Sequence, residues 1–262
     1  MALLRFFFAL MAAFAFGLPA MALEHGCRPE MAEGRPRIIP ASLSEKELRI
    51  SFVGHASFLI ETPQNVKAVT DYNDYVRAEV VPDIATMNKA HSTHYSRNPE
   101  AGITHLLPGW NPRGGRADHD VTLLDLRVRN VSTNIRTWDG GHTEFDGNSI
   151  FIFELGDFCV VHLGHLHHTL EPAHIRAIGR ADIVLVPVDS GFTMDIEGMM
   201  EVLEKLSPRI VIPMHFFGPH TLEKFIRIGS EKYVIDRREK PTGVFSRESL
   251  PDRPTMVVMP GR

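Results

Sequence analysis

Histidines gathered in three short segments are the main functional signal of this chain. Two of them are His91 and His94, four lie within residues 162–168, and His215 follows the apolar run 210–214. Imidazole is the commonest side-chain metal ligand, and a chain with 14 His but only 2 Cys would build a metal site mainly from nitrogen and oxygen. The pattern therefore indicates metal chemistry if the fold brings the three segments together.

The elements predicted around these histidines are strands first, and then strands that alternate with helices. This order predicts an α/β or α+β domain with helices packed on sheets. Each histidine group follows an apolar run, and layered α/β proteins usually place ligands and catalysts at strand ends. We expect strands at 48–53, 57–62, 66–71, 84–87, 121–126, 129–135, 149–154, 158–162, 183–188, 210–214 and 255–259, and helices at 171–178, 195–206 and 221–228.

The first 22 residues have the composition of a signal peptide. Arg5 precedes an apolar run at 6–18, and Ala20-Met21-Ala22 supplies an A-x-A cleavage site. We expect cleavage near Ala22 and a single domain over 23–262 that is periplasmic or secreted. The apolar run is short for a membrane span and no second one follows, so no stable membrane insertion is expected after cleavage.

Charge and cysteine content narrow the partners. The formal net charge is -4 and the basic residues are scattered, which argues against a nucleic-acid interface and favours a small-molecule substrate. Cys27 and Cys159 could form a disulfide in an oxidising compartment, or both could stay free. The Gly/Pro-rich stretch 108–116 either borders the pocket or forms a surface loop.

Seven segments spread along the chain carry a family resemblance. They are 54–61, 84–94, 147–150, 162–168, 181–187, 193–195 and 212–215. Their order resembles that of the metallo-β-lactamase superfamily, and most of all its branch similar to ascorbate-6-phosphate lactonases and related metal-dependent hydrolases. The resemblance implies a four-layer αββα sandwich with a metal site at one edge, normally two zinc ions that activate a bridging hydroxide.

The metal-ligand motifs of that superfamily are only partly present. Its H-x-H-x-D-H motif reads Lys-Ala-His-Ser-Thr-His at 89–94, so Lys89 replaces a histidine and Thr93 replaces the aspartate. Its H-L-G-D motif, whose carboxylate usually bridges the metals, ends here in His165. One nitrogen ligand and two carboxylates are therefore replaced in these motifs.

A further departure lies before the Gly-Asn block. Trp138 stands where the superfamily has a histidine, and His142, four residues on, is a possible substitute. Only His91, His94 and His215 keep both the position and the identity that the resemblance implies.

These replacements change how many ions the site can hold. Neutral imidazoles offset none of the four positive charges of two zinc ions, so two close ions would repel strongly. We expect at most one ion, Zn²⁺ or, by ligand type, Cu²⁺ or Ni²⁺. Its expected ligands are His94, His165 and His215. His91 is expected either as a fourth ligand or as a hydrogen-bond donor to the ligands. Lys89 would place its charge where the first metal normally sits.

Three functional interpretations follow. In the first, an exported hydrolase uses metal-activated water on a small ester, lactone or phosphodiester; Asp139 or Asp71 orients the water, and Lys89 binds an anionic group. In the second, a periplasmic metal-binding or ligand-binding protein keeps the fold without hydrolysis. A third, weaker interpretation has no metal, and the histidines only form hydrogen bonds. Other residues expected in the pocket or behind the ligands are His55, Thr93, Trp138, His142 and His168.

Overall fold

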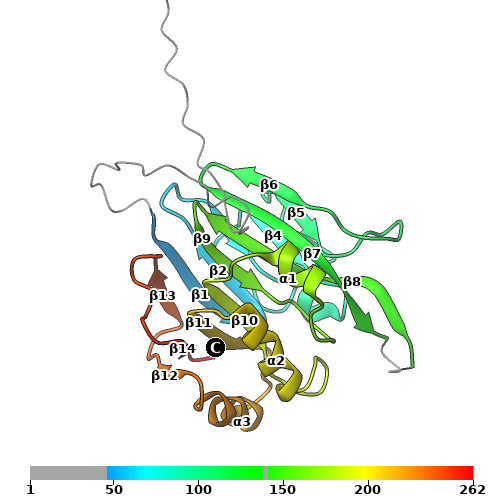
Figure 1. Cartoon of the computed structure of the whole chain (residues 1–262). Helices are drawn as coiled ribbons and strands as arrows, with labels where there is room; N and C mark the ends of the chain where they lie inside the picture. Colours follow the sequence, from blue (N-terminus) through cyan, green and yellow to red (C-terminus); the bar gives the residue numbers. More distant parts are fainter. Residues whose placement is uncertain (1–45, 138–140, 262) are drawn as a thin grey trace, which may run out of the picture.

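Two β-sheets form the frame of the protein in a computed structural model that describes residues 46–137 and 141–261 (Figure 1). The expected signal peptide 1–22 lies outside the described residues. The same is true of Cys27, Trp138 and Asp139. The six-stranded sheet has the order β13 (Thr242–Phe245), β1 (Leu48–Gly54), β2 (Ser57–Glu61), β3 (Lys67–Val69), β4 (Ile84–Met87) and β5 (His105–Pro108). The eight-stranded sheet has the order β12 (Val234–Arg237), β14 (Thr255–Val258), β11 (Ile210–Met214), β10 (Ile183–Pro187), β9 (Phe158–His162), β8 (Thr143–Leu155), β7 (Leu126–Arg136) and β6 (Asp120–Leu123).

Side-chain alternation along β8 gives this strand two apolar faces. Phe151 and Phe153 point into the core between the two sheets, whereas Ile150 and Ile152 belong to the core under the helices. Because successive side chains of a strand point to opposite faces, a strand buried on both sides must be apolar at nearly every position. The run of buried residues that ends β8 therefore places it in the middle of the sandwich.

Three α-helices cover the outer face of the eight-stranded sheet: α1 (Pro172–Ile178), α2 (Ile196–Leu206) and α3 (Pro219–Gly229) (Figure 1). Asp195 begins α2 as its N-cap and accepts a hydrogen bond from the Gly198 amide at 2.7 Å. The apolar stripe of α2 is buried in this core; its residues are Ile196, Met199, Val202, Leu203 and Leu206.

The predicted fold class is confirmed. The predicted strands at 48–53, 57–62 and 66–71 are present as β1, β2 and β3, which pair as an antiparallel meander. All three predicted helices are present. Among the described residues the outer face of the six-stranded sheet carries loops and a 3-10 turn, η3 (Ser92–His94), in place of a helical layer. The strands that the sequence did not predict are β5, β12 and β13, which are all edge strands with at most one buried side chain each. Their incomplete burial removes the apolar pattern that marks a buried strand.

The parallel strands β9, β10 and β11 set the position of the functional site. They run side by side in the same direction, so the segments that follow them emerge at one edge of the sheet. These segments carry His165, Asp189 and His215. The edge thus collects polar side chains from three separate parts of the sequence.

No helix in the described parts of the chain is long and apolar enough to cross a membrane.

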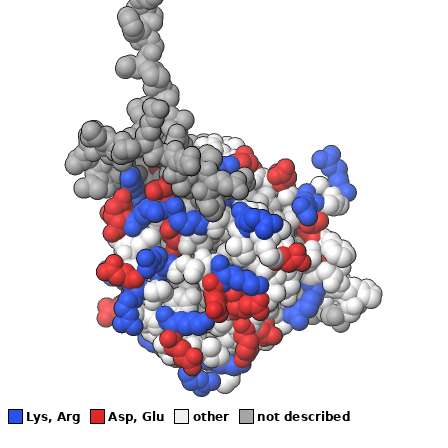
Figure 2. All heavy atoms as spheres, in the orientation of Figure 1, with Lys and Arg blue, Asp and Glu red and all other residues white. Residues whose placement is uncertain are grey.

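On the face shown in Figure 2, acidic and basic side chains are interspersed. Mixed charge of this kind is typical of a surface that carries no electrostatic footprint for a polyanion.

A buried ion pair ties β7 and β8 to α1. The Arg129 guanidinium donates from Nε to the Glu154 carboxylate at 2.6 Å. Its Nη1 and Nη2 donate to the carbonyl oxygens of Ala177 and Ile178, at 2.7 Å each. Both charged side chains are almost completely buried, and the arginine therefore also satisfies carbonyls at the end of α1.

We expect Glu154→Gln to lower the free energy of unfolding by about 3 kcal/mol, because it leaves the buried Arg129 charge without its carboxylate. Urea unfolding measures this change. Glu223→Gln, which breaks the exposed pair with Arg237, is the control and should cost less than about 1 kcal/mol. Equal effects of the two substitutions would contradict the structural role of the Arg129–Glu154 pair.

Candidate metal centre

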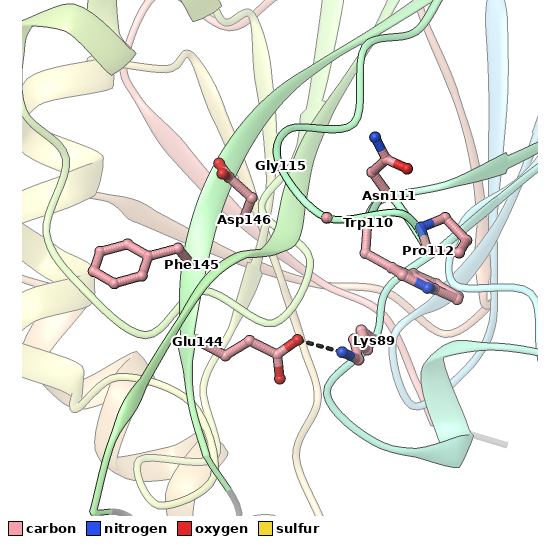
Figure 3. Close-up of a pocket in the computed structure, with 9 residues that line it drawn as sticks. Lys89, Trp110, Asn111, Pro112, Gly115, Glu144, Phe145 and Asp146 are labelled. Atoms are coloured by element: carbon pink, nitrogen blue, oxygen red, sulfur yellow. Dashed lines mark hydrogen bonds and ion pairs between the residues drawn. The ribbon is translucent and has the colours of Figure 1, made fainter.

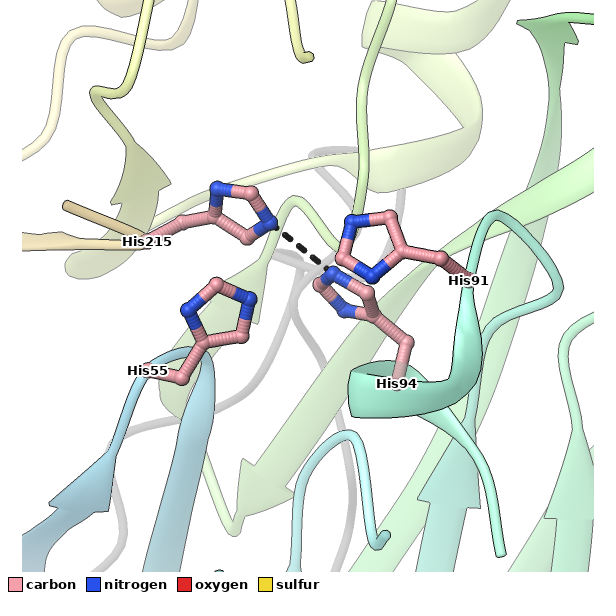
Figure 4. A group of neighbouring side chains, drawn as sticks. All are labelled: His55, His91, His94 and His215. Carbon is pink, nitrogen blue, oxygen red and sulfur yellow. Dashed lines mark hydrogen bonds between the residues drawn. The ribbon is translucent and has the colours of Figure 1, made fainter. Parts of the chain in front are cut away.

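Five imidazole rings meet at this edge of the sandwich. The ligand nitrogens of His55, His91, His94 and His215 all lie within 4.8 Å of one another, and the rings point toward one another in Figure 4. His165 is the fifth, with Nε2 at 3.0 Å from Nε2 of His91. The structure therefore brings together the four histidines predicted as ligands and adds His55, which was expected in the pocket or behind them.

Backbone geometry fixes the two histidines that face each other across the sheets. His55, in the turn between β1 and β2, and His215, directly after β11, both have left-handed φ values, 54° and 57°. This conformation is uncommon for residues other than glycine and is often found at functional sites. The His215 amide donates to the His55 carbonyl at 2.7 Å, and His162 Nε2 donates to the Ala56 carbonyl at 2.9 Å. These bonds hold the turn against the end of β11.

The position of His165 depends on the glycine before it. Gly164 has a φ of 60°, and a Cβ atom there would lie 2.5 Å from both Asn88 Nδ2 and Asn148 Oδ1. Asn148 Oδ1 accepts the His165 amide at 2.7 Å. A glycine is therefore needed for the close approach that seats His165 in the cluster.

Two carboxylates stand behind the fully buried rings of His94 and His215. Asp71 Oδ2 lies 2.5 Å from His94 Nδ1, and Asp189 Oδ1 lies 3.0 Å from His215 Nδ1. Burial raises the pKa of Asp71 to about 6. Burial also opposes ionisation of Asp189, but contacts with His215 and Thr193 outweigh it and hold the Asp189 pKa below its usual value. Both carboxylates are thus ionised at pH 7.

Asp71 determines where the His94 ring carries its hydrogen. A neutral imidazole has one N–H, and Asp71 accepts it from Nδ1 of His94, so Nε2 of His94 presents a lone pair. His215 Nδ1 contacts Asp189 Oδ1 but forms no hydrogen bond within the described residues. The Nε2 atoms of His94 and His215 lie 2.9 Å apart. Burial holds the His94 pKa well below its usual value, so the His94 ring is neutral and its Nε2 can bind a cation.

A second set of hydrogen bonds runs through His165 and is complete in itself. The backbone N–H and Nε–H of Arg136 both donate to His167 Nδ1 at 3.1 Å, so His167 carries its hydrogen on Nε2. His167 then donates to His165 Nδ1 at 2.5 Å, and His165 donates from Nε2 to His91. His91 in turn donates from Nδ1 to Thr93 Oγ1 at 2.7 Å. In this arrangement His165 is a hydrogen-bond donor to His91.

The donor set of the first group fits a divalent transition-metal ion. Nε2 of His55 is buried and forms no hydrogen bond within the described residues, and the His55 ring lies 4.0 Å from that of His215. Burial lowers the pKa of His55 to about 3 and that of His91 to about 4, so both rings are neutral at pH 7. Three neutral nitrogens from His55, His94 and His215 are a ligand set that catalytic zinc sites use.

Other residues predicted for the site lie elsewhere. Lys89 forms an ion pair with Glu144 in a pocket of about 220 Å³ that is also lined by Trp110 (Figure 3). His142 is exposed and donates from Nδ1 to the Gly141 carbonyl. Both nitrogens of His168 are used, by the Asn134 amide and the Thr169 carbonyl. Trp110 and other residues of the stretch 108–116 line this pocket, which is a different one from the pocket beside His91.

Sequence reasoning missed Asp189 and Arg136. Asp189 had a usable signal, because it follows the predicted apolar strand 183–188 just as His215 follows 210–214. The histidine-rich segment 162–168 predicts His167 at the rim of the pocket or in solvent, and His167 does line a pocket with His91, but its hydrogen bond with His165 was not predicted. Arg136 had no signal, because its role depends on the neighbouring strands and loops that the fold brings to it.

Acidification should destabilise the metal-free protein. His55 and His91 have folded-state pKa values of about 3 and about 4 against 6.5 for an unperturbed imidazole, so the unfolded chain binds more protons below pH 6.5. The free energy of unfolding should therefore fall as the pH decreases from 6.5 toward 4. Asp71 opposes this trend, since its pKa is raised from 3.8 to about 6, but it is one group against several histidines.

Urea midpoints in the presence of a chelator, at pH 7 and pH 5, measure this effect. The midpoint should be lower at pH 5, and the difference should shrink in a His55→Asn/His91→Asn variant. An equal or higher midpoint at pH 5 would show that the buried neutral histidines do not determine the acid stability.

Comparisons with known proteins agree with this architecture. A "UPF0173 metal-dependent hydrolase" of Methanosarcina mazei is 25% identical over 196 residues, which are 65% of this chain and 84% of that protein. Another of Carboxydothermus hydrogenoformans is 26% identical over 200 residues, with 64% of this chain and 84% of that protein covered.

Solved structures give the same result. A candidate Zn-dependent hydrolase of the metallo-β-lactamase superfamily from Thermotoga maritima superposes with a TM-score of 0.62 at 25% identity, over 82% of this chain and all of that one. A family model described as the beta-lactamase superfamily domain matches residues 49–215, from β1 to the last histidine of the cluster. The chain therefore belongs to the metallo-β-lactamase superfamily.

Proposed function

We propose that this protein is a metal-dependent hydrolase that holds one divalent transition-metal ion with His94, His215 and His55. The observation that carries the proposal is the convergence of imidazole nitrogens: Nε2 of His94 and Nε2 of His215 lie 2.9 Å apart, and the ligand nitrogens of His55, His91, His94 and His215 all lie within 4.8 Å of one another. The names of the relatives, metal-dependent hydrolases and a Zn-dependent hydrolase, support the same chemistry. Zinc is the first choice of ion, and Cu²⁺ or Ni²⁺ also suits nitrogen ligands.

Charge balance supports one ion. The ionised carboxylates of Asp71 and Asp189 provide two negative charges directly behind the ligand rings, which match the charge of one divalent ion. A second ion would need further ligands, but the His91 lone pair is taken by His165. Lys89, which stands at a ligand position of the superfamily, is paired with Glu144. We therefore propose a mononuclear centre.

The ion would supply Lewis acidity and would activate water for hydrolysis. The chain supplies the approach to it, through a pocket of about 180 Å³ lined by His91, Arg136, His167 and Phe192. His91 belongs to both the pocket and the cluster, so a substrate in the pocket reaches the ion beside His91. The size of this pocket favours a small ester, lactone or phosphodiester group as the reacting part of the substrate.

One observation favours the alternative of a metal-binding or ligand-binding protein without hydrolysis. Both carboxylates at the centre contact the outer nitrogens of histidine rings, and His165 occupies the place of the superfamily's bridging aspartate. Within the described residues, no carboxylate is therefore placed among the inner nitrogens to orient a water molecule. Metal content and hydrolysis must be measured together for this reason.

His215→Ala should remove both bound metal and hydrolysis, because it deletes one of the two imidazole nitrogens that lie 2.9 Å apart. Elemental analysis of the zinc-reconstituted wild type should give about one equivalent per chain, and the variant should lose affinity by at least about 100-fold. Hydrolysis of small esters, lactones and phosphodiesters should be lost with a chelator and restored by zinc.

The controls separate ligands from neighbours. His168→Ala should keep the metal, since both nitrogens of His168 bond elsewhere, and His165→Gln should keep it because glutamine can still donate to His91. Two equivalents of zinc in the wild type would contradict the mononuclear centre, and no bound metal after reconstitution would overturn the proposal. Metal binding without hydrolysis of any substrate class would establish the alternative function.

A further inference from the structure

Two exposed phenylalanines stand at the mouth of the histidine cluster. The side chains of Phe192 and Phe217 are 50% and 65% exposed, and their ring centroids lie 5.5 Å apart at 63°. Phe217 lies 5.2 Å from the His55 ring and 5.5 Å from the His215 ring. Phe192 lies 6.3 Å from the His91 ring. The pair therefore forms an apolar rim directly beside the nitrogens proposed to bind the ion.

The backbone that carries Phe192 is held from both sides. Asp189 Oδ2 accepts the amides of Gly191, Phe192 and Thr193 at 3.0, 2.6 and 3.2 Å. The Arg136 Nη2 donates to the carbonyl oxygens of the same three residues at 3.1, 3.2 and 2.8 Å. A loop fixed by this many hydrogen bonds presents its phenyl ring at a defined place, so little conformational entropy is lost when a ligand packs on it.

Phe217 is held by its neighbours in sequence. Phe216 turns inward, with its ring 6.0 Å from that of Phe52 in the core between the sheets. Pro219 begins α3 two residues after Phe217. His215 before them is fixed in the left-handed conformation. The chain therefore turns one phenylalanine into the core and leaves the next one at the mouth of the site.

Single exposed apolar side chains are ordinary on a protein surface. Two adjacent aromatic rings, on fixed backbones, next to a metal-ligand cluster and a pocket, indicate a binding surface instead. Phe192 also lines the 180 Å³ pocket, so the rim is continuous with the path to His91. Aromatic rings prefer edge-to-face or offset contacts with other rings, and the exposed parts of the Phe192 and Phe217 rings can form such contacts with a ligand.

We propose that Phe192 and Phe217 form an aromatic clamp that binds an aryl substituent of the substrate while its hydrolysable group lies at the histidines. This inference rests on the proposed metal-dependent hydrolase and names its substrate class, a small ester, lactone or phosphodiester that carries an aromatic ring. The carboxylate of Asp189 couples the two functions, because it backs His215 and also holds the loop of Phe192.

Direct binding of two metal-chelating probes to the zinc-loaded protein tests the clamp without turnover. Benzohydroxamate and acetohydroxamate share the chelating group and differ in the aryl ring. Calorimetry should show that the wild type binds benzohydroxamate about 10-fold more tightly than acetohydroxamate, as two aromatic contacts predict. In Phe192→Ala and in Phe217→Ala this ratio should fall to about 3-fold or less, with the zinc content unchanged.

Phe145→Ala is the matched control, because Phe145 is 76% exposed and lines the pocket of Lys89. It should leave the ratio at its wild-type value. A wild-type ratio near one, or a ratio that both clamp variants leave unchanged, would overturn the clamp and leave the metal centre standing. Failure of the zinc-loaded protein to bind either hydroxamate would overturn the metal centre and the clamp together.

Discussion

The approach of His94 Nε2 to His215 Nε2 is the constraint on which the rest of the site depends. Asp71 accepts the hydrogen of His94 at its outer nitrogen, so the inner nitrogen of His94 keeps a lone pair 2.9 Å from the inner nitrogen of His215. Burial keeps the His94 ring neutral, and neutral imidazole nitrogens that converge in this way are suited to bind a cation. Because these rings are held by the two sheets, binding of a metal ion to them would add its free energy to the stability of the fold.

Maintaining that approach requires fixed supports on both sides of the sandwich. Asp71 is held by Asn88, whose Nδ2 donates to Asp71 Oδ1 at 2.9 Å, and Asn88 also accepts the Ser149 amide from β8. On the other side Asp189 follows β10 and accepts three amides of the loop after it. Both carboxylates are therefore oriented by backbone and by neighbouring side chains, as the groups behind metal ligands usually are. These hydrogen bonds connect the proposed metal site to the two sheets and thereby fix the positions of its side chains.

The sequence predicted the frame of this site better than its chemistry. Apolar runs at 158–162, 183–188 and 210–214 predicted the buried strands, because side chains buried on both faces leave an unmistakable pattern. The convergence of His91, His94 and His215 followed from their positions after such runs and from the family resemblance. The sequence could not predict that His55 is the proposed ligand and that His165 is a hydrogen-bond donor to His91. These roles depend on which ring nitrogens carry hydrogens, and Arg136, His167 and Asp71 determine this. Likewise the partner of Lys89 is set by Glu144 on a distant strand, 55 residues away.

X-ray absorption at the zinc edge of the reconstituted protein tests the central claim most directly. A mononuclear centre built on His94, His215 and His55 predicts about three imidazole nitrogens at ~2.0–2.1 Å from the zinc ion. It also predicts no metal–metal scattering at ~3.5–4 Å. A metal–metal signal at that distance would contradict the account. A first shell with a single imidazole, as expected for an adventitious surface ion, would contradict it equally.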